Sequence, residues 1–201
     1  KNSNYSNGTN IQIENCNNGQ NQKFKLNRFT SIKKYTGIDV SQYQGNINWE
    51  KVANTKLGFA IIRLGYGDNW TSQDDKKFVT NVENCEKYNI PYGVYLYSYA
   101  KKANGVTGLN QNSESAQSEA AHAMRLINSL SYKPNLKTSV YIDMEEDTLA
   151  YLGKSTLTSI ANKFCQTISN NGYGCSTYAN NNWLKNNLNA KVIISAQRAK
   201  F

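Results

Sequence analysis

From Tyr35 onward, short apolar runs alternate with segments of helical periodicity, and this alternation restricts the fold more than any other feature. The run Leu57–Arg63 (LGFAIIR) is almost continuously apolar, as is typical of a strand with both faces buried in a parallel sheet. The other predicted strands cover residues 37–41, 91–99, 139–143, 173–178 and 191–196, and the predicted helices begin near residue 48 or cover 74–88, 116–130 and 157–170. This regular alternation predicts an α/β fold in which helices cover a parallel sheet.

Residues 1–35 differ in composition from the rest of the chain and are dominated by Asn, Gln, Gly and Ser. Two short alternating runs on either side of a polar turn predict two small strands. The stretch from Ile11 to Phe24, with a Cys, a polar turn and a Gln-x-aromatic motif, resembles the end of a ricin-type lectin repeat. We therefore expect a short β-rich segment and linker over residues 1–35, and a larger domain over residues 36–201.

The formal net charge of +9 comes from 23 basic and 14 acidic residues, and the basic residues form no stripe on any predicted element. A nucleic-acid-binding protein would cluster Lys and Arg on a recognisable module, so we predict no nucleic-acid partner. No apolar run approaches the roughly 20 residues that span a bilayer, and no apolar segment follows Lys1, so we predict neither a membrane span nor a signal peptide. An anionic cell wall accounts for the charge as well as simple solubility does.

The cysteines and the single histidine do not suggest a metal site. Cys16, Cys85, Cys165 and Cys175 lie far apart and include no CxxC pair, which argues against zinc binding and thioredoxin-type chemistry. Their spacing allows one or two disulfides without choosing a pairing. His122 falls in a helical run and is expected on the helix surface or half-buried. We predict a protein that works without a metal or an organic cofactor.

Three acidic residues stand where predicted strands end. Asp39 ends the first strand, and Asp143 and Glu145 end the fourth, at the edge of the sheet where parallel α/β folds place their active sites. Asp143 and Glu145 point the same way, about 6 to 7 Å apart along the strand. Two carboxylates this close raise one pKa and leave a protonated acid beside an ionised partner, as glycoside hydrolysis requires. The competing interpretation is a solvated acidic loop that caps the next helix.

Tyrosines alternate along the strand that precedes these acids. Tyr95, Tyr97 and Tyr99 share one strand face, and Tyr178 ends another strand. Their rings are suited to line a groove beside the acids and to stack on sugar faces. The competing interpretation is that they are core tyrosines with paired hydroxyl groups, and we expect it to hold for at least one of them.

Four motifs in order along residues 36–196 resemble the glycoside hydrolase family 25 muramidases. They are Gly37–Gly45 (GIDVSQYQG), Gly58–Gly67 (GFAIIRLGYG), Gly93–Ala100 (GVYLYSYA) and Tyr141–Glu145 (YIDME). The resemblance implies a distorted TIM-like β/α barrel that cleaves the β-1,4 bond between N-acetylmuramic acid and N-acetylglucosamine in bacterial peptidoglycan. It also implies a secreted, extracellular enzyme, and we expect a monomer.

The same resemblance implies roles for individual residues. Glu145 matches the general acid, Asp143 its partner on the strand, and Asp39 the acid of the first strand. The residues that match groove aromatics are Tyr95, Tyr97 and Tyr178. In the mechanism that we favour, Glu145 protonates the glycosidic oxygen. Asp143 orients the 2-acetamido group of the substrate, whose oxygen attacks the anomeric carbon, and Asp39 holds Asp143 or the sugar by hydrogen bonds.

The sequence departs from the family pattern at two places. Leu96 stands where the family usually has His. Family members also continue into further strands with a Trp-containing segment and another acidic residue, whereas this sequence stops soon after its sixth predicted strand. We therefore expect a barrel that is incomplete at its C-terminal end, with an unpaired strand edge.

Two other functions fit some of the same features. A non-catalytic carbohydrate-binding protein would use the lectin-like segment and the aromatic groove without turnover. A chitinase-like hydrolase would also end a barrel strand with Asp-x-Glu, although the Asp39-Val-Ser strand argues against it. Digestion of purified peptidoglycan and of chitin, compared side by side, separates the three functions.

Overall fold

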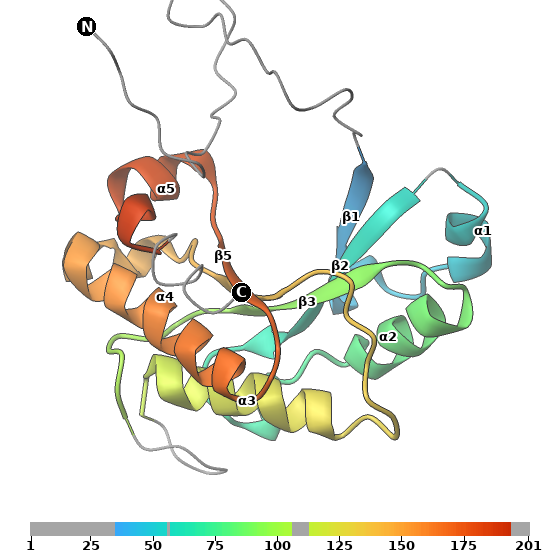
Figure 1. Cartoon of the computed structure of the whole chain (residues 1–201), viewed down its shortest axis with the longest axis horizontal. Helices are drawn as coiled ribbons and strands as arrows, with labels where there is room; N and C mark the ends of the chain where they lie inside the picture. Colours follow the sequence, from blue (N-terminus) through green and yellow to red (C-terminus); the bar gives the residue numbers. More distant parts are fainter. Residues whose placement is uncertain (1–34, 56, 106–112, 194–201) are drawn as a thin grey trace, which may run out of the picture. The chain divides into compact units, whose positions relative to one another are not determined.

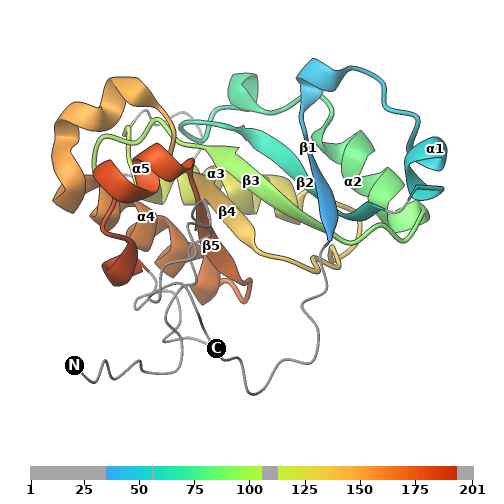
Figure 2. The ribbon, with the colours of Figure 1, turned by 90° about the horizontal axis from the view of Figure 1, so that it is seen from above.

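The computed structural model describes residues 35–55, 57–105 and 113–193. The strands are β1 (Thr36–Val40), β2 (Leu57–Tyr66), β3 (Tyr92–Tyr97), β4 (Val140–Asp143) and β5 (Cys175–Tyr178). They form one sheet of five strands in the order β1-β2-β3-β4-β5, and every neighbouring pair is parallel. Figure 2 shows the strands side by side in chain order. The predicted α/β fold with a parallel sheet is therefore confirmed.

The helices follow the strands in alternation. The α-helices are α1 (Trp49–Ala53), α2 (Phe78–Lys87), α3 (Ala116–Asn128), α4 (Gly153–Asn170) and α5 (Asn181–Asn186), with short 3₁₀ turns η2 (Gln42–Gln44), η3 (Thr71–Gln73) and η4 (Asp147–Leu152). Helices α2, α3 and α4 pack against the sheet, and α3 lies beside α4 (Figure 1). Along the described part of the chain, no helix is both long and apolar enough to cross a membrane.

Capping side chains set where several helices begin. Asn48 precedes α1, and its Oδ1 accepts a hydrogen bond from the backbone N–H of Lys51 at 3.0 Å. Ser115 precedes α3, and its hydroxyl accepts from the backbone N–H of Ser118 at 3.2 Å. Each cap satisfies a backbone donor that has no partner inside the helix. Helix α2 begins at Phe78, whereas the predicted helix begins at residue 74. Asp74 and Asp75 precede the helix and bind basic side chains elsewhere in the fold.

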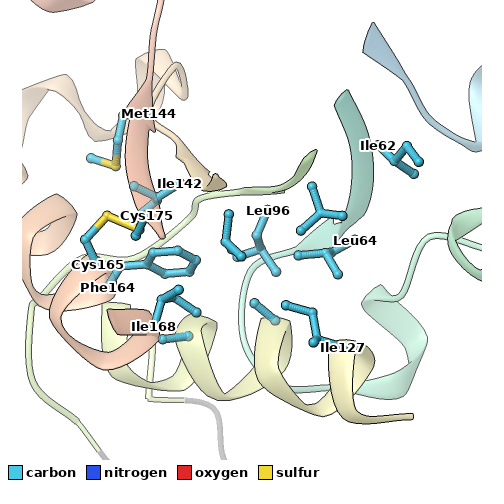
Figure 3. Packing of buried hydrophobic residues seen from close by; sticks show 14 of the residues in the cluster. Ile62, Leu64, Leu96, Ile127, Ile142, Met144, Phe164, Cys165, Ile168 and Cys175 are labelled. Carbon is cyan, nitrogen blue, oxygen red and sulfur yellow. A yellow bond between two sulfur atoms is a disulfide. The ribbon is translucent and has the colours of Figure 1, made fainter. Parts of the chain in front are cut away.

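The core fills the space between the sheet and the helices. Leu64, Leu96 and Ile142 point from the strands toward the helices, where they meet Ile127 of α3 and Phe164 of α4 (Figure 3). Because strand side chains alternate between the two faces, the residues next to them must lie on the opposite face. The apolar positions therefore fix which face of the sheet carries the polar and aromatic side chains.

A disulfide joins Cys165 of α4 to Cys175 of β5, ten residues along the chain. Cys85 is a buried free thiol, and burial raises its pKa to about 12. This disulfide agrees with the prediction that the chain has one or two. Cys16 lies outside the described residues. The lectin-like segment predicted for the N-terminal residues also lies outside them.

The prediction of a sixth strand over residues 191–196 is wrong for residues 191–193, the part of it that the structure describes. Residues 190–193 form a helical turn, in which the backbone N–H groups of Val192 and Ile193 both donate to the carbonyl oxygen of Asn189. A short apolar run fits a buried helical turn as well as a strand, and here Ile193 is buried in the core. Residues 194–196 lie outside the described part. Within that part, β1 and β5 are the edges of the sheet, and closure into a barrel stays a prediction.

We expect replacement of both Cys165 and Cys175 by alanine to lower the free energy of unfolding by about 2–4 kcal/mol, because the cross-link restricts the unfolded chain. Urea denaturation without reductant measures the difference. As controls, reductant should destabilise the wild type and leave the double variant unchanged. Equal stability of the two proteins without reductant would contradict this contribution.

Candidate active site

The sheet register brings the predicted acids to one edge. Asp39 lies near the end of β1, and Asp143 is the last residue of β4, opposite Tyr97 of β3 on one side and Tyr178 of β5 on the other. Because the strands are parallel, their carboxyl ends meet at the same edge, where the α/β architecture places catalytic groups. The negative charges of Glu145 and Asp39 both act on Asp143. The structure thus brings Asp39, Asp143 and Glu145 together.

Asp143 is the buried member of this cluster. Its exposed fraction is 5%, and its buried Oδ1 has no hydrogen-bond partner among the described residues. Burial first, and then the charges of Glu145 and Asp39, raise its pKa to about 8. The raised pKa favours the protonated form of the Asp143 carboxyl group. A protonated carboxyl group can donate a hydrogen bond as well as accept one.

Glu145 lies two residues beyond Asp143 and is half-buried. Between them, the backbone N–H of Met144 donates to the carbonyl oxygen of Tyr178 at 2.9 Å, and the Met144 side chain is buried. This contact holds the Asp-Met-Glu segment against β5. Burial and then the charge of Glu145 raise the pKa of Tyr178, so the carboxylate of Glu145 acts on both Asp143 and Tyr178.

Asp39 is tied to the neighbouring strands. A hydrogen bond links its carboxylate to Tyr95 of β3, and Arg63 of β2 faces it with a positive charge. Burial of the carboxyl group raises the pKa of Asp39, while the Tyr95 hydrogen bond and the Arg63 charge lower it. Arg63 is itself fixed by Asp75, whose Oδ2 accepts from Arg63 Nε at 2.7 Å. Asp75 Oδ2 also accepts from the backbone N–H of Gln42 at 2.9 Å, which anchors the turn after β1.

The predicted tyrosines take different places around the acids. Tyr95 is half-buried with its hydroxyl paired to Asp39, so it fits the paired-hydroxyl interpretation. Tyr97 is half-buried, and its hydroxyl donates to Glu146 Oε2 at 3.3 Å. Tyr178 has an exposed fraction of 43% at the end of β5. The ring centroids of Tyr97 and Tyr99 are 5.3 Å apart, and those of Tyr99 and Tyr66 are 6.0 Å apart, which forms a continuous aromatic surface.

A groove extends from these tyrosines over the ends of β1, β2 and β3. Its cavity volume is about 620 Å³, within the usual range for small-molecule sites. Its lining includes Tyr43, Arg63, Tyr66, Asp74, Tyr97 and Tyr99. The Arg63 guanidinium lies 4.7 Å from the centroid of the Tyr43 ring. Tyr97 lines this groove and also pairs with Asp143 across the sheet, so the groove lies next to the strand that carries the acid cluster.

The sequence analysis missed a buried acid on α3. Glu119 is fully buried, and its two oxygens accept from the Ser98 hydroxyl and from the backbone N–H of Tyr99, both at 2.7 Å. Burial raises its pKa to about 8. Glu119 thus fixes the backbone of the groove residue Tyr99. A signal was present, because Glu119 falls on the helix face that carries Ala116, Ala120 and Ala123.

The prediction that His122 lies on the helix surface or is half-buried is wrong. Its side chain is completely buried, with Nε2 2.8 Å from Asp74 Oδ1 and Nδ1 3.2 Å from the carbonyl oxygen of Gly67. Burial lowers its pKa. The loop after β2 folds back onto α3 and covers the imidazole, which the helical periodicity of α3 could not reveal. Across residues 35–55, 57–105 and 113–193, no three His, Cys, Asp or Glu side chains are grouped to hold a metal ion.

Comparison with known proteins agrees with this architecture. The family model "Glycosyl hydrolases family 25" matches residues 38–199, so the chain belongs to this family of glycoside hydrolases. Lysozyme M1 of Streptomyces globisporus is 35% identical over 69 residues, which make up 34% of this chain and 22% of that protein.

Among solved structures, the modular autolysin LytC from Streptococcus pneumoniae superposes with a TM-score of 0.64 and 28% identity, covering 78% of this chain and 35% of LytC. A second LytC structure, in complex with a synthetic peptidoglycan ligand, gives a TM-score of 0.63 at the same identity. The catalytic domain of the endolysin ply40 from bacteriophage P40 of Listeria monocytogenes shares the fold, with a TM-score of 0.59 and 20% identity over 77% of this chain and 68% of that domain. The chain spans only about a third of LytC and less of Lysozyme M1.

The buried carboxyl group of Glu119 makes stability depend on pH. Its ordinary pKa of 4.5 rises to about 8 on folding, so between these values the folded protein binds more protons than the unfolded chain. The free energy of unfolding therefore contains a contribution that falls as pH rises, by up to about 1.4 kcal/mol per pH unit. Glu119→Gln should remove this contribution and give a flatter dependence in urea denaturation between pH 5 and 8. Glu83→Gln, at an exposed position of α2, is the matched control, and identical slopes for wild type and Glu119→Gln would contradict the assignment.

Proposed function

We propose that this chain is a muramidase, which hydrolyses the β-1,4 bond between N-acetylmuramic acid and N-acetylglucosamine in bacterial peptidoglycan. The observation that carries the proposal is the acid cluster, in which the buried Asp143, with its raised pKa, adjoins the half-buried Glu145 and pairs with the groove residue Tyr97. Two carboxyl groups in different environments divide acid and base roles. Membership of glycosyl hydrolases family 25 and the peptidoglycan ligand in the LytC complex support the substrate.

In the proposed mechanism, Asp143 and Glu145 act as a coupled pair that shares one proton. The proton resides on Asp143 in the free protein, where burial opposes charge. When the substrate brings the N–H of its 2-acetamido group to Asp143, that hydrogen bond favours the ionised form of Asp143. The proton is then held by Glu145, which faces the glycosidic oxygen.

Cleavage then follows by substrate assistance. The acetamido oxygen forms a bond to the anomeric carbon as the bond from that carbon to the glycosidic oxygen breaks, and Glu145 transfers its proton to the departing oxygen. Water next attacks the anomeric carbon and gives a proton back to Glu145, while the bond to the acetamido oxygen breaks. The negative charge of Asp143 stabilises the positive charge that develops on the acetamido nitrogen.

The remaining predicted residues support this arrangement. Asp39, held by Tyr95 and Arg63, keeps a carboxylate beside Asp143 and so contributes to its raised pKa. Tyr97 and Tyr178 offer ring faces on either side of Asp143 for the sugar units. We further propose that the enzyme acts outside the cell as a monomer, that its sheet forms part of a distorted β/α barrel, and that residues 1–35 add a lectin-like sugar contact.

Glu145→Gln and Asp143→Asn should each reduce the rate of peptidoglycan hydrolysis by about 10²- to 10⁴-fold, because each removes a group that acts in the transition state. Release of reducing ends from purified peptidoglycan measures the rate, with Glu50→Gln at an exposed position of α1 as the control. Turnover of Glu145→Gln at the wild-type rate would exclude the assignment. Binding without turnover in the wild type would favour a non-catalytic carbohydrate-binding protein, and faster release from chitin would favour a chitinase-like hydrolase.

The pH profile of kcat/KM should lose activity as pH rises through about 8, where the Asp143–Glu145 pair loses its shared proton. Asp39→Asn removes a negative charge that raises the Asp143 pKa, so this alkaline limb should move to lower pH in the variant. Initial rates from pH 4 to 10 on soluble peptidoglycan fragments measure the shift. An alkaline limb at the same pH in both proteins would show that Asp39 does not act on the pair.

A further inference from the structure

A second, smaller cavity lies beside the groove. Its volume is about 120 Å³, and Tyr99 lines both the cavity and the groove. The other side chains that matter here come from the loop after β2 and from the start of α3. They are Asp68, Trp70, Gln73, Glu114 and Glu119. This acidic cavity takes no part in the mechanism proposed above.

Two residues of the cavity lining have a buried acceptor atom without a donor among the described residues. Asp68 has an exposed fraction of 6%, and its Oδ2 accepts from the backbone N–H of Glu114 at 3.0 Å. Within the part of the chain that the structure describes, its buried Oδ1 has no hydrogen-bond partner, and the same holds for Oε1 of Gln73. A buried acceptor without a donor costs folding free energy, so buried polar groups are almost always paired. The cavity is therefore suited to an occupant that donates hydrogen bonds.

Asp68 is the lining acid whose negative charge no basic side chain of the described residues balances. Burial of Glu119 raises its pKa to about 8, which favours its uncharged form. Glu114 already pairs with Lys101, whose Nζ lies 2.6 Å from Glu114 Oε1. Within the described residues, no Lys, Arg or His forms an ion pair with Asp68. The two nearby basic side chains on α3, His122 and Arg125, both bind Asp74 instead.

The chemistry of the lining selects a primary ammonium group. Such a group supplies three N–H donors and a positive charge to Asp68, and the lining also includes the aromatic residue Trp70. Nowhere in the described residues are three His, Cys, Asp or Glu side chains grouped to hold a metal ion. Water would satisfy the acceptors without balancing the charge.

We propose that this cavity binds the primary ammonium group of a peptide attached to the glycan chain that the groove holds. This inference rests on the proposed function, because peptidoglycan is a glycan that carries peptides with free side-chain amino groups. Tyr99 lines both the groove, in which the glycan would lie, and the cavity. The site would make the enzyme prefer strands whose peptides are not cross-linked, since cross-linking converts this amine into an amide.

The first test compares two soluble disaccharide-peptides that differ only at one side-chain amino group. One carries a free side-chain amine and the other has the same amine N-acetylated, and isothermal titration calorimetry on the full chain gives both dissociation constants. We expect the acetylated fragment to bind at least about tenfold more weakly, since it loses a charge-assisted contact. Equal affinities would overturn the proposal and indicate a cavity filled by water. This comparison needs no variant and therefore does not depend on how a substitution folds.

The second test locates the amine. Asp68→Asn keeps the shape of the side chain and removes its charge, so it should abolish the preference for the free amine, whereas Glu83→Gln should keep it. A preference that survives Asp68→Asn would overturn the assignment to this cavity. Methylammonium tests recognition of the ammonium group alone: at high concentration it should weaken binding of the free-amine fragment and leave the acetylated fragment unchanged. No competition at any concentration would contradict the proposal.

Hydrolysis of a glycan from which the peptides have been removed separates this inference from the proposed function. That reaction depends on the acid cluster and not on the cavity. If the bare glycan is cleaved while the two disaccharide-peptides bind equally, the ammonium site is wrong and the muramidase assignment stands. If no peptidoglycan is cleaved while the preference for the amine persists, the proposed enzymatic function fails on its own.

Discussion

The parallel register of β3, β4 and β5 is the constraint on which the candidate site depends. It sets Asp143 between Tyr97 and Tyr178, and the alternation of side chains turns Ile142 toward the helices. A shift of one residue would bury the acid among the core side chains and expose the isoleucine. The apolar packing against α3 and α4 therefore also fixes the position of the Asp143 carboxyl group.

Buried and half-buried acids hold the loops around that edge. Asp75 binds Arg63 and the turn after β1, Asp74 binds His122 and Arg125 of α3, and Glu119 fixes the backbone of Tyr99. Each of these acids is satisfied by hydrogen bonds, which gives it a defined geometry. Together they attach the loops at the ends of β1, β2 and β3 to the rigid sheet and helices, and so shape the groove.

Asp143 and Asp68 differ from those structural acids. Each is buried and has an oxygen atom without a hydrogen-bond partner among the described residues. Asp143 belongs to the acid cluster, and Asp68 lines the small cavity that shares Tyr99 with the groove. Unsatisfied acceptors are tolerated where a ligand completes them. This shared feature is the basis on which we propose a catalytic role for Asp143 and an ammonium contact for Asp68.

The sequence by itself determined where the five described strands lie along the chain, the acids at their ends and the family motifs. These features depend on local periodicity and on residues close together in the chain. It could not distinguish a strand from a helical turn at residues 191–193, where a short apolar run fits both. The tertiary structure alone decided the burial of Glu119 and His122, the Cys165–Cys175 pairing and the side chain that carries the raised pKa at the acid cluster. These depend on contacts between segments far apart in the sequence, since burial and nearby charge set a pKa and only the folded chain creates them.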